Sequence, residues 1–109
     1  QSVRAPDVSF VAREHISPAG VPEGFWQIPP DLAVEVVSPT DRPDDIQDKV
    51  IEYLNAGTRL VWLVYPRTQT ITAYRSLKEA RIFTREDVLS GEDVVPGFSC
   101  KVSAVFETI

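Results

Sequence analysis

The stretch DLAVEVVSP, residues 31 to 39, predicts a buried strand with one charged side chain at its centre. Because strand side chains alternate between two faces, Leu32, Val34 and Val36 share a wholly apolar face. An unpaired carboxylate in a buried strand is costly, so it normally neutralises, pairs with a cation or binds a metal. Glu35 is therefore the first candidate functional residue. The face opposite the apolar one carries Asp31, Ala33, Glu35 and Val37.

The residues after this strand predict a helix from about 43 to 56. Pro43 suits the first turn of a helix, Gly57 suits the position just past its end, and either Thr40 or Asp41 is expected to cap it. A second apolar run, RLVWLVYP, predicts a strand from 59 to 65. A strand, a helix and a strand joined by short connections form a right-handed crossover, which makes the two strands parallel.

One face of the predicted helix is apolar. At about 100° per residue, Ile46, Val50, Tyr53 and Leu54 fall together on that face, and Lys49 lies on its flank. Lys49 can therefore reach back toward the sheet. An alternative is that Lys49 is a solvated partner of Asp45, four residues earlier.

The rest of the chain predicts further short elements. The segment 70 to 75 forms a hairpin with the strand before it. Residues 13 to 30 are rich in proline and glycine and predict a long loop, in which Phe25 and Trp26 are expected to pack onto the core. The remaining predicted elements are strands at 7 to 12, 80 to 85 and 94 to 102, and a closing helix over 103 to 109 that Ser103 caps. The expected fold class is α/β, with a mixed sheet and flanking helices.

Length and composition predict one soluble domain spanning residues 1 to 109. No apolar run approaches the roughly 20 residues that a membrane-spanning helix needs. Cys100 is the one cysteine, so an internal disulfide is excluded and a reducing cytoplasm is the expected location. The net charge of −5 argues weakly against nucleic acid, since proteins that bind it usually carry a clustered basic surface.

Three polar residues are candidates for one site: Asp7 at the start of the first strand, Glu35, and Lys49 on the helix. Two carboxylates can hold Mg²⁺ or Mn²⁺ through oxygen ligands, and a lysine ammonium can orient water and stabilise charge that develops on a phosphate. We therefore expect Asp7 and Glu35 as metal ligands and all three residues as catalytic. For Glu35 the alternative is a buried salt bridge to an arginine.

The chain resembles the putative restriction endonuclease group of the PD-(D/E)XK nuclease superfamily. The resemblance rests on VRAPDVSFV, PPDLAVEVVSPT and DDIQDKVIEYLNAGTRLVWLVYP in this order, covers a core from 4 to about 76, and includes the PGF near the C-terminus. It implies a restriction-endonuclease-like fold and a metal-dependent active site. It also implies a nucleic-acid partner, which is expected to be DNA, and it allows a homodimer. Full-length relatives have an N-terminal region before the PDV motif, so this chain is expected to lack the N-terminal part of the full fold.

By this resemblance, Asp7 is the first acidic ligand and Glu35 the second. The lysine of the (D/E)XK triplet would stand at position 37, where this chain has Val37, and Lys49 on the adjacent helix takes over its role. The expected function is a metal-dependent endonuclease. The alternatives are a non-catalytic interaction domain that retains the nuclease fold and a metal-dependent phosphoesterase with another substrate.

Overall fold

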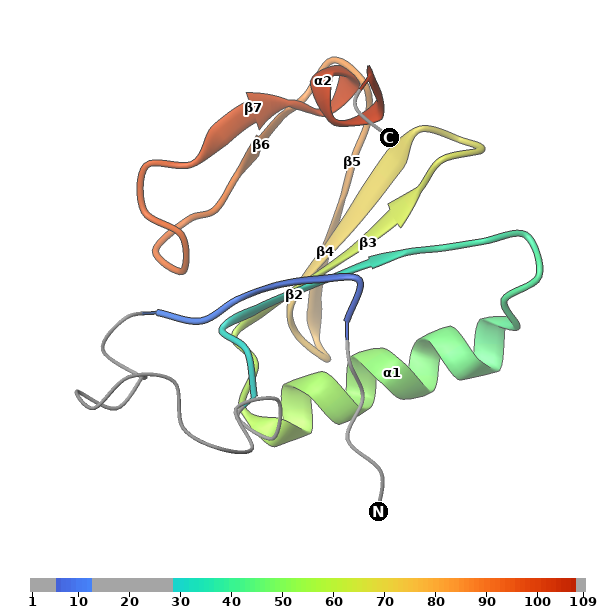
Figure 1. Cartoon of the computed structure of the whole chain (residues 1–109), viewed down its shortest axis with the longest axis vertical. Helices are drawn as coiled ribbons and strands as arrows, with labels where there is room; N and C mark the ends of the chain where they lie inside the picture. The colour runs from blue at the N-terminus through green and yellow to red at the C-terminus, as the bar shows by residue number, and fades with distance from the viewer. Residues whose placement is uncertain (1–5, 13–28, 108–109) are drawn as a thin grey trace.

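The computed structural model describes residues 6–12 and 29–107. Five strands form one sheet in the order β1 (Val8–Phe10), β2 (Leu32–Val36), β3 (Leu60–Tyr65), β4 (Thr70–Ser76) and β5 (Glu79–Phe83) (Figure 1). The β2–β3 pair is parallel and the other three pairs are antiparallel. The predicted mixed α/β sheet and the crossover between 31–37 and 59–65 are thus confirmed.

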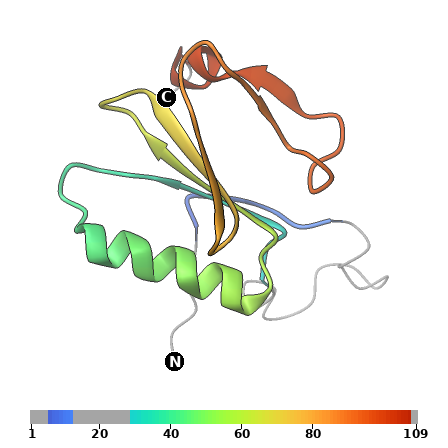
Figure 2. The same ribbon diagram turned by 180° about the vertical axis from the view of Figure 1, so that it is seen from behind.

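Helix α1 (Pro43–Ala56) crosses one face of this sheet, as Figures 1 and 2 show from opposite sides. Its buried residues Val50 and Tyr53 pack against Ala33, Val61 and Leu63 on the strands below. The predicted bounds and the predicted apolar face are both confirmed. Because β2 alternates, this is also the face that carries Glu35.

The two ends of α1 differ from each other in how they are terminated. Gly57 adopts a left-handed conformation with φ of 112°, and its N–H donates to the Leu54 carbonyl at 3.2 Å, as a glycine just past the end of a helix commonly does. At the other end the predicted cap by Thr40 or Asp41 is wrong, because the capping position is Arg42 and no side chain caps the helix. Instead, the Asp41 carboxylate accepts the Ser38 N–H at 2.8 Å.

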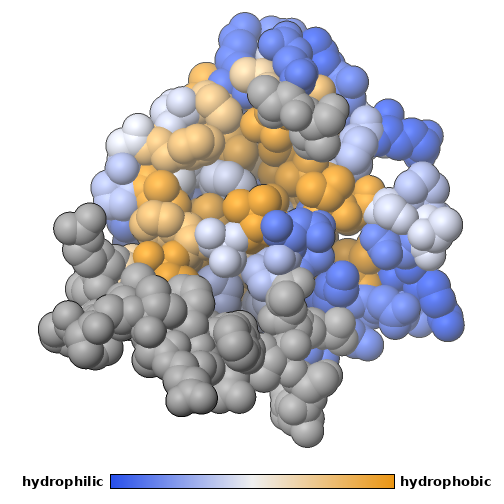
Figure 3. Space-filling view, viewed as in Figure 1, coloured by the Kyte–Doolittle hydropathy of each residue, from blue (hydrophilic) through white to orange (hydrophobic). Residues whose placement is uncertain are grey.

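A second layer covers the opposite face of the sheet. It consists of β6 (Val88–Ser90), β7 (Ser99–Lys101) and α2 (Val102–Glu107), which lie on the side away from α1 in Figures 1 and 2. Leu89 and Val102 from this layer join the sheet residues in an apolar cluster. Figure 3 shows apolar side chains gathered on this side of the molecule.

The prediction for this C-terminal region is only partly correct. The strand predicted over 94–102 is limited to β7, and its partner β6 was not predicted. Pro96, which cannot donate a backbone hydrogen bond, and Gly97, with φ of 85°, interrupt the segment before the strand begins. Helix α2 begins at Val102, so Ser103 lies inside the helix and not at the predicted capping position; its N–H donates to the Arg85 carbonyl at 3.2 Å.

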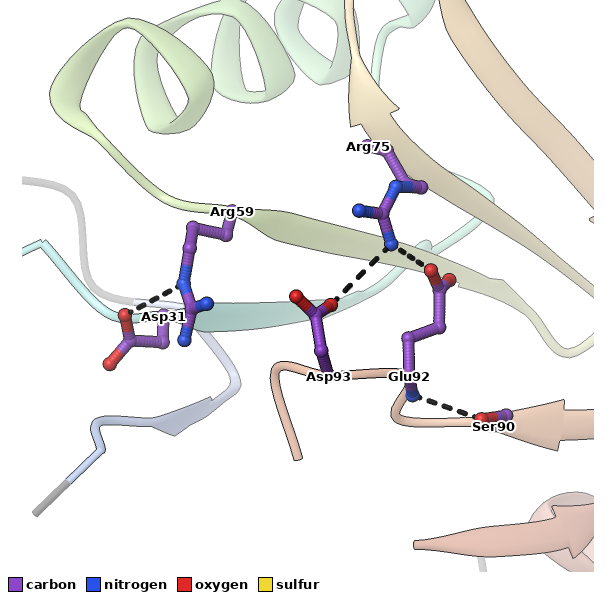
Figure 4. Close-up of polar contacts among 6 residues, drawn as sticks. All are labelled: Asp31, Arg59, Arg75, Ser90, Glu92 and Asp93. Atoms are coloured by element: carbon purple, nitrogen blue, oxygen red, sulfur yellow. Dashed lines mark hydrogen bonds and ion pairs between the residues drawn. The ribbon is translucent and has the colours of Figure 1, made fainter. Parts of the chain in front are cut away.

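Two groups of ion pairs link separate parts of the chain (Figure 4). On β4, Arg75 pairs with Glu92 and lies 3.7 Å from Asp93, both in the segment that follows β6. These side chains are largely exposed, so solvent screens the contact and it contributes little to stability. The second pair joins Arg59 to Asp31 at 3.3 Å.

Asp31 is part of the scaffold. It is 5% exposed, and its carboxylate accepts the Ala12 N–H at 2.7 Å as well as the Arg59 contact. Its backbone N–H donates to the Phe10 carbonyl at 2.8 Å, so the residue joins the chain after β1 to the starts of β2 and β3. The loop predicted over 13–30, with Phe25 and Trp26, lies almost wholly outside the described residues. Within the described part of the chain, no helix is long and apolar enough to cross a membrane.

We expect Asp31→Asn to destabilise the protein by about 1–3 kcal/mol, because the buried carboxylate loses its charge-assisted hydrogen bonds. Urea unfolding of both proteins checks this. The stability difference should be the same with and without Mn²⁺. A variant as stable as the wild type would contradict the scaffold role.

Candidate active site

Glu35 is a buried carboxylate in the middle of the sheet. Its side chain is 7% exposed, and the residue pairs in register with Leu63 of the fully covered strand β3. Both carboxylate oxygens have a partner on α1: the Lys49 ammonium lies 3.3 Å from Oε1, and the Tyr53 hydroxyl donates to Oε2 at 2.7 Å. The high cost of burying the charge is therefore offset by one ion pair and one hydrogen bond.

Helical spacing explains why Lys49 and Tyr53 meet the same carboxylate. Residues four apart lie on one face of a helix, and this face of α1 packs on β2 and β3. The sequence placed Lys49 within reach of the sheet, and the structure brings its ammonium to Glu35. Among the ion pairs of the described residues, Lys49 pairs with Glu35 and not with Asp45.

Tyr53 is the site residue that sequence analysis missed. It was assigned to the apolar face of the helix, and its ring is indeed buried there at 4% exposure. The signal was the hydroxyl, since a buried tyrosine usually finds a hydrogen-bond partner for it. The acceptor is Glu35 on the facing strand, and only the packing of α1 on β2 identifies it.

Asp7 immediately precedes β1 at the edge of the sheet. Its Oδ2 accepts the Val36 N–H at 2.7 Å, which attaches the residue to the end of β2. The antiparallel register pairs Val8 with Val34 and, continued by one residue, sets Asp7 opposite Glu35. Directly opposite residues of an antiparallel pair share a face, so a ladder extended to Asp7 would put its side chain on the same side of the sheet as Glu35. Asp7 itself lies in a bend just before β1.

The three predicted site residues differ in how far their side chains are exposed to solvent. Asp7 is exposed, Glu35 is buried, and the Lys49 side chain is 33% exposed. The site therefore runs from a buried carboxylate beneath the helix to an open edge strand. An ion or a phosphate that approached from solvent would meet Asp7 and the Lys49 ammonium first.

The donor set fits a hard divalent cation. Mg²⁺ prefers oxygen ligands, often binds through only one or two carboxylates, and keeps several of its waters. Asp7 and Glu35 are two such carboxylates. Within residues 6–12 and 29–107, no three or more histidine, cysteine or acidic side chains are grouped so that they could hold a metal.

The chain was compared with known proteins. A family model described as putative restriction endonuclease, Uma2, matches residues 1–103. A crystal structure of a putative nuclease belonging to DUF820 from Anabaena variabilis superposes with a TM-score of 0.79 at 23% sequence identity. The match covers 95% of this chain and 60% of that one. A comparison with curated proteins found no match.

The structural match agrees with the five-stranded mixed sheet described above. At 23% identity the structural match shows a shared fold, and it confirms the predicted restriction-endonuclease-like architecture. The family model extends over almost the whole chain, including Asp7, Glu35 and Lys49. The chain belongs to the Uma2 family of putative restriction endonucleases.

Proposed function

We propose that this domain is a metal-dependent endonuclease that hydrolyses phosphodiester bonds of DNA. The observation that carries the proposal is the buried Glu35 carboxylate, which is held by Lys49 and Tyr53 of α1, with Asp7 bound to the backbone of the next residue of β2, Val36. In this proposal Asp7 and Glu35 hold Mg²⁺ or Mn²⁺. A bound ion of this kind would activate water and offset negative charge on the phosphate.

Each residue has a distinct part in the proposed reaction. Tyr53 fixes the Glu35 side chain through its hydroxyl, so the carboxylate stays oriented beneath the helix. The Val36 N–H does the same for Asp7. Lys49 stands between the buried carboxylate and solvent, where its ammonium can orient the attacking water and stabilise the charge that develops on the phosphorane. Because the chain has a net charge of −5, it repels a phosphate, and the positive charge of Lys49 and of a bound metal ion would offset that repulsion.

One observation favours a different function. Both oxygens of Glu35 are already satisfied by residues of the chain, as they would be in a purely structural ion pair. A non-catalytic interaction domain with a retained nuclease fold would show the same contacts. The two functions differ in what happens when a divalent ion is added, and the following experiments use that difference.

We expect Glu35→Gln to abolish Mn²⁺ binding and cleavage of plasmid DNA, because the amide removes the charge that holds the ion. Without metal, the variant should lose only about 1–2 kcal/mol, since the half-exposed Lys49 can turn to solvent and the amide oxygen still accepts from Tyr53. Thermal melts with and without Mn²⁺ measure both effects. Asp48→Asn on an exposed part of α1 is the matched control and should behave as wild type. A wild type that is indifferent to Mn²⁺ would rule out the metal site.

Asp7→Asn should leave stability nearly unchanged, because the asparagine oxygen can still accept the Val36 N–H. It should nevertheless weaken Mn²⁺ binding at least tenfold and remove nuclease activity, which calorimetric titration and plasmid cleavage would record. Asp31→Asn is the informative comparison, since both aspartates follow a proline. It should show the opposite pattern: lower stability and unchanged metal affinity. Equal Mn²⁺ affinity in Asp7→Asn and wild type would exclude Asp7 as a ligand.

Lys49→Met separates catalysis from metal binding. Removing the ammonium leaves the buried Glu35 charge unpaired, so the metal-free variant should be less stable by about 1–3 kcal/mol. Added Mn²⁺ should restore much of that loss, and cleavage should still fall by about 10²–10³-fold because charge stabilisation at the phosphate is missing. Lys49→Arg, which keeps the charge, should retain the stability. If Mn²⁺ stabilises Lys49→Met no more than wild type, the ion pair serves only the scaffold.

A further inference from the structure

A second feature of the structure lies outside the proposed catalytic residues. It is a cavity of about 430 Å³ at the carboxyl ends of the parallel strands β2 and β3. Ligands of open α/β sheets commonly bind outside the carboxyl ends of such strands. The cavity is lined by two short segments, Val37, Ser38 and Pro39 after β2, and Tyr65, Pro66, Arg67 and Thr68 at the end of β3 and after it.

The cavity lies on the same face of the sheet as Glu35, further along the parallel strands. Val37 follows Glu35 by two residues, so its side chain points to the same side about 7 Å further along the strand. Its N–H donates to the Val64 carbonyl at 2.8 Å, which extends the parallel pairing to this point. Val37 and Tyr65 both pack against the cluster beneath α1. A strand of nucleic acid with a phosphate at Glu35 would therefore have its neighbouring nucleotide at this cavity.

The walls of the cavity suit a flat aromatic ligand. Tyr65 is half-buried, and Pro39 and Pro66 add rigid apolar surface to the lining. Nucleobases stack on aromatic side chains with little dependence on which base it is. A tyrosine is uncharged at neutral pH, and burial, with a smaller effect of the neighbouring Tyr74, raises the pKa of Tyr65 further.

The rim of the cavity carries an available cation. Arg67 is exposed, and within the described part of the chain no carboxylate lies within ion-pair distance of it. Arg59 and Arg75, by contrast, are both paired with acidic residues. A planar guanidinium without a carboxylate partner matches phosphate in charge and in hydrogen-bond geometry. The chain has a net charge of −5, so an exposed arginine without a carboxylate partner beside an apolar cavity sets the rim around Arg67 apart from the paired arginines.

From these observations we propose that the cavity is a nucleotide subsite, in which one unstacked base packs against Tyr65 and the two prolines while Arg67 binds the adjoining phosphate. The inference rests on the proposed nuclease function and adds a substrate class to it. Taking a base out of a duplex costs stacking and pairing energy, and a single strand avoids most of that cost. The domain should therefore bind single-stranded DNA, or DNA with a displaced base, in preference to an intact duplex.

Binding can be measured separately from cleavage. Fluorescence anisotropy of the full chain with a labelled single-stranded oligodeoxynucleotide, without divalent metal, gives the dissociation constant. Tyr65→Leu should weaken binding at least about fivefold through the lost stacking. Arg67→Gln should weaken it severalfold and reduce the slope of log K against log salt by about 0.7, as expected for one phosphate contact on a single strand. On an abasic oligonucleotide of the same length, Tyr65→Leu should bind as wild type does, whereas Arg67→Gln should remain weaker.

Two control variants make the outcome specific. Tyr65→Phe keeps the ring and should retain wild-type affinity. Arg81→Gln removes the same charge as Arg67→Gln, but its guanidinium lies on β5, over the Phe83 ring at 5.2 Å, and it should have little effect. If Tyr65→Leu and Arg67→Gln bind as wild type, or if Arg81→Gln is equally weak, the subsite is wrong while the proposed nuclease function stands. If the wild type binds no oligonucleotide in this metal-free assay, the subsite is wrong, whereas the proposed nuclease function fails only if plasmid DNA is not cleaved when Mn²⁺ is present.

Discussion

The requirement that both faces of strand β3 be covered determines the layers of this structure. Five of its six residues are buried, and none of them is polar, so the strand is stable only between two layers. Helix α1 supplies one layer, and the β6–β7 pair with α2 supplies the other. The parallel partner β2 follows from the same constraint, because the crossover that pairs β2 with β3 is the helix that covers them. The candidate site lies in the α1 layer, where the covering helix meets the one acidic residue of β2.

Burial beneath α1 fixes the orientation of the Glu35 carboxylate and shields it from water. A carboxylate on the surface would be hydrated and would bind a divalent ion weakly, whereas one beneath a helix has its orientation fixed by its neighbours. Lys49 and Tyr53 come from consecutive turns of α1, so the position of the helix sets the geometry of the site. The chain belongs to a family of putative restriction endonucleases. In the proposed function this helix contributes the catalytic lysine.

Sequence patterns predicted the central part of this fold well. Strong apolar runs and helix-termination signals located β2, α1 and β3 to within about a residue, and helical periodicity brought Lys49 to Glu35. The failures came where tertiary contacts decide the structure. Short strand β6 has only three residues, and two of them are exposed, so no apolar pattern marks it. Likewise, nothing local in the sequence shows that Asp41 binds the Ser38 N–H instead of capping α1, or that the Tyr53 hydroxyl meets Glu35.

Strand β1 has only three residues, and a ladder that short could pair with β2 in more than one alignment. Two aspartates, one just before β1 and one just before β2, prevent such alternative alignments. Asp7 binds the N–H of Val36 on β2, and Asp31, just before β2, binds the N–H of Ala12 just after β1. These two contacts are reciprocal, and both would break if the strands shifted by a single residue. Such a shift would also turn the Asp7 side chain to the face away from Glu35. The two Pro-Asp dipeptides of the sequence thus act together to fix the alignment of β1 with β2. In the proposed function, this alignment also decides whether Asp7 can share a metal ion with Glu35.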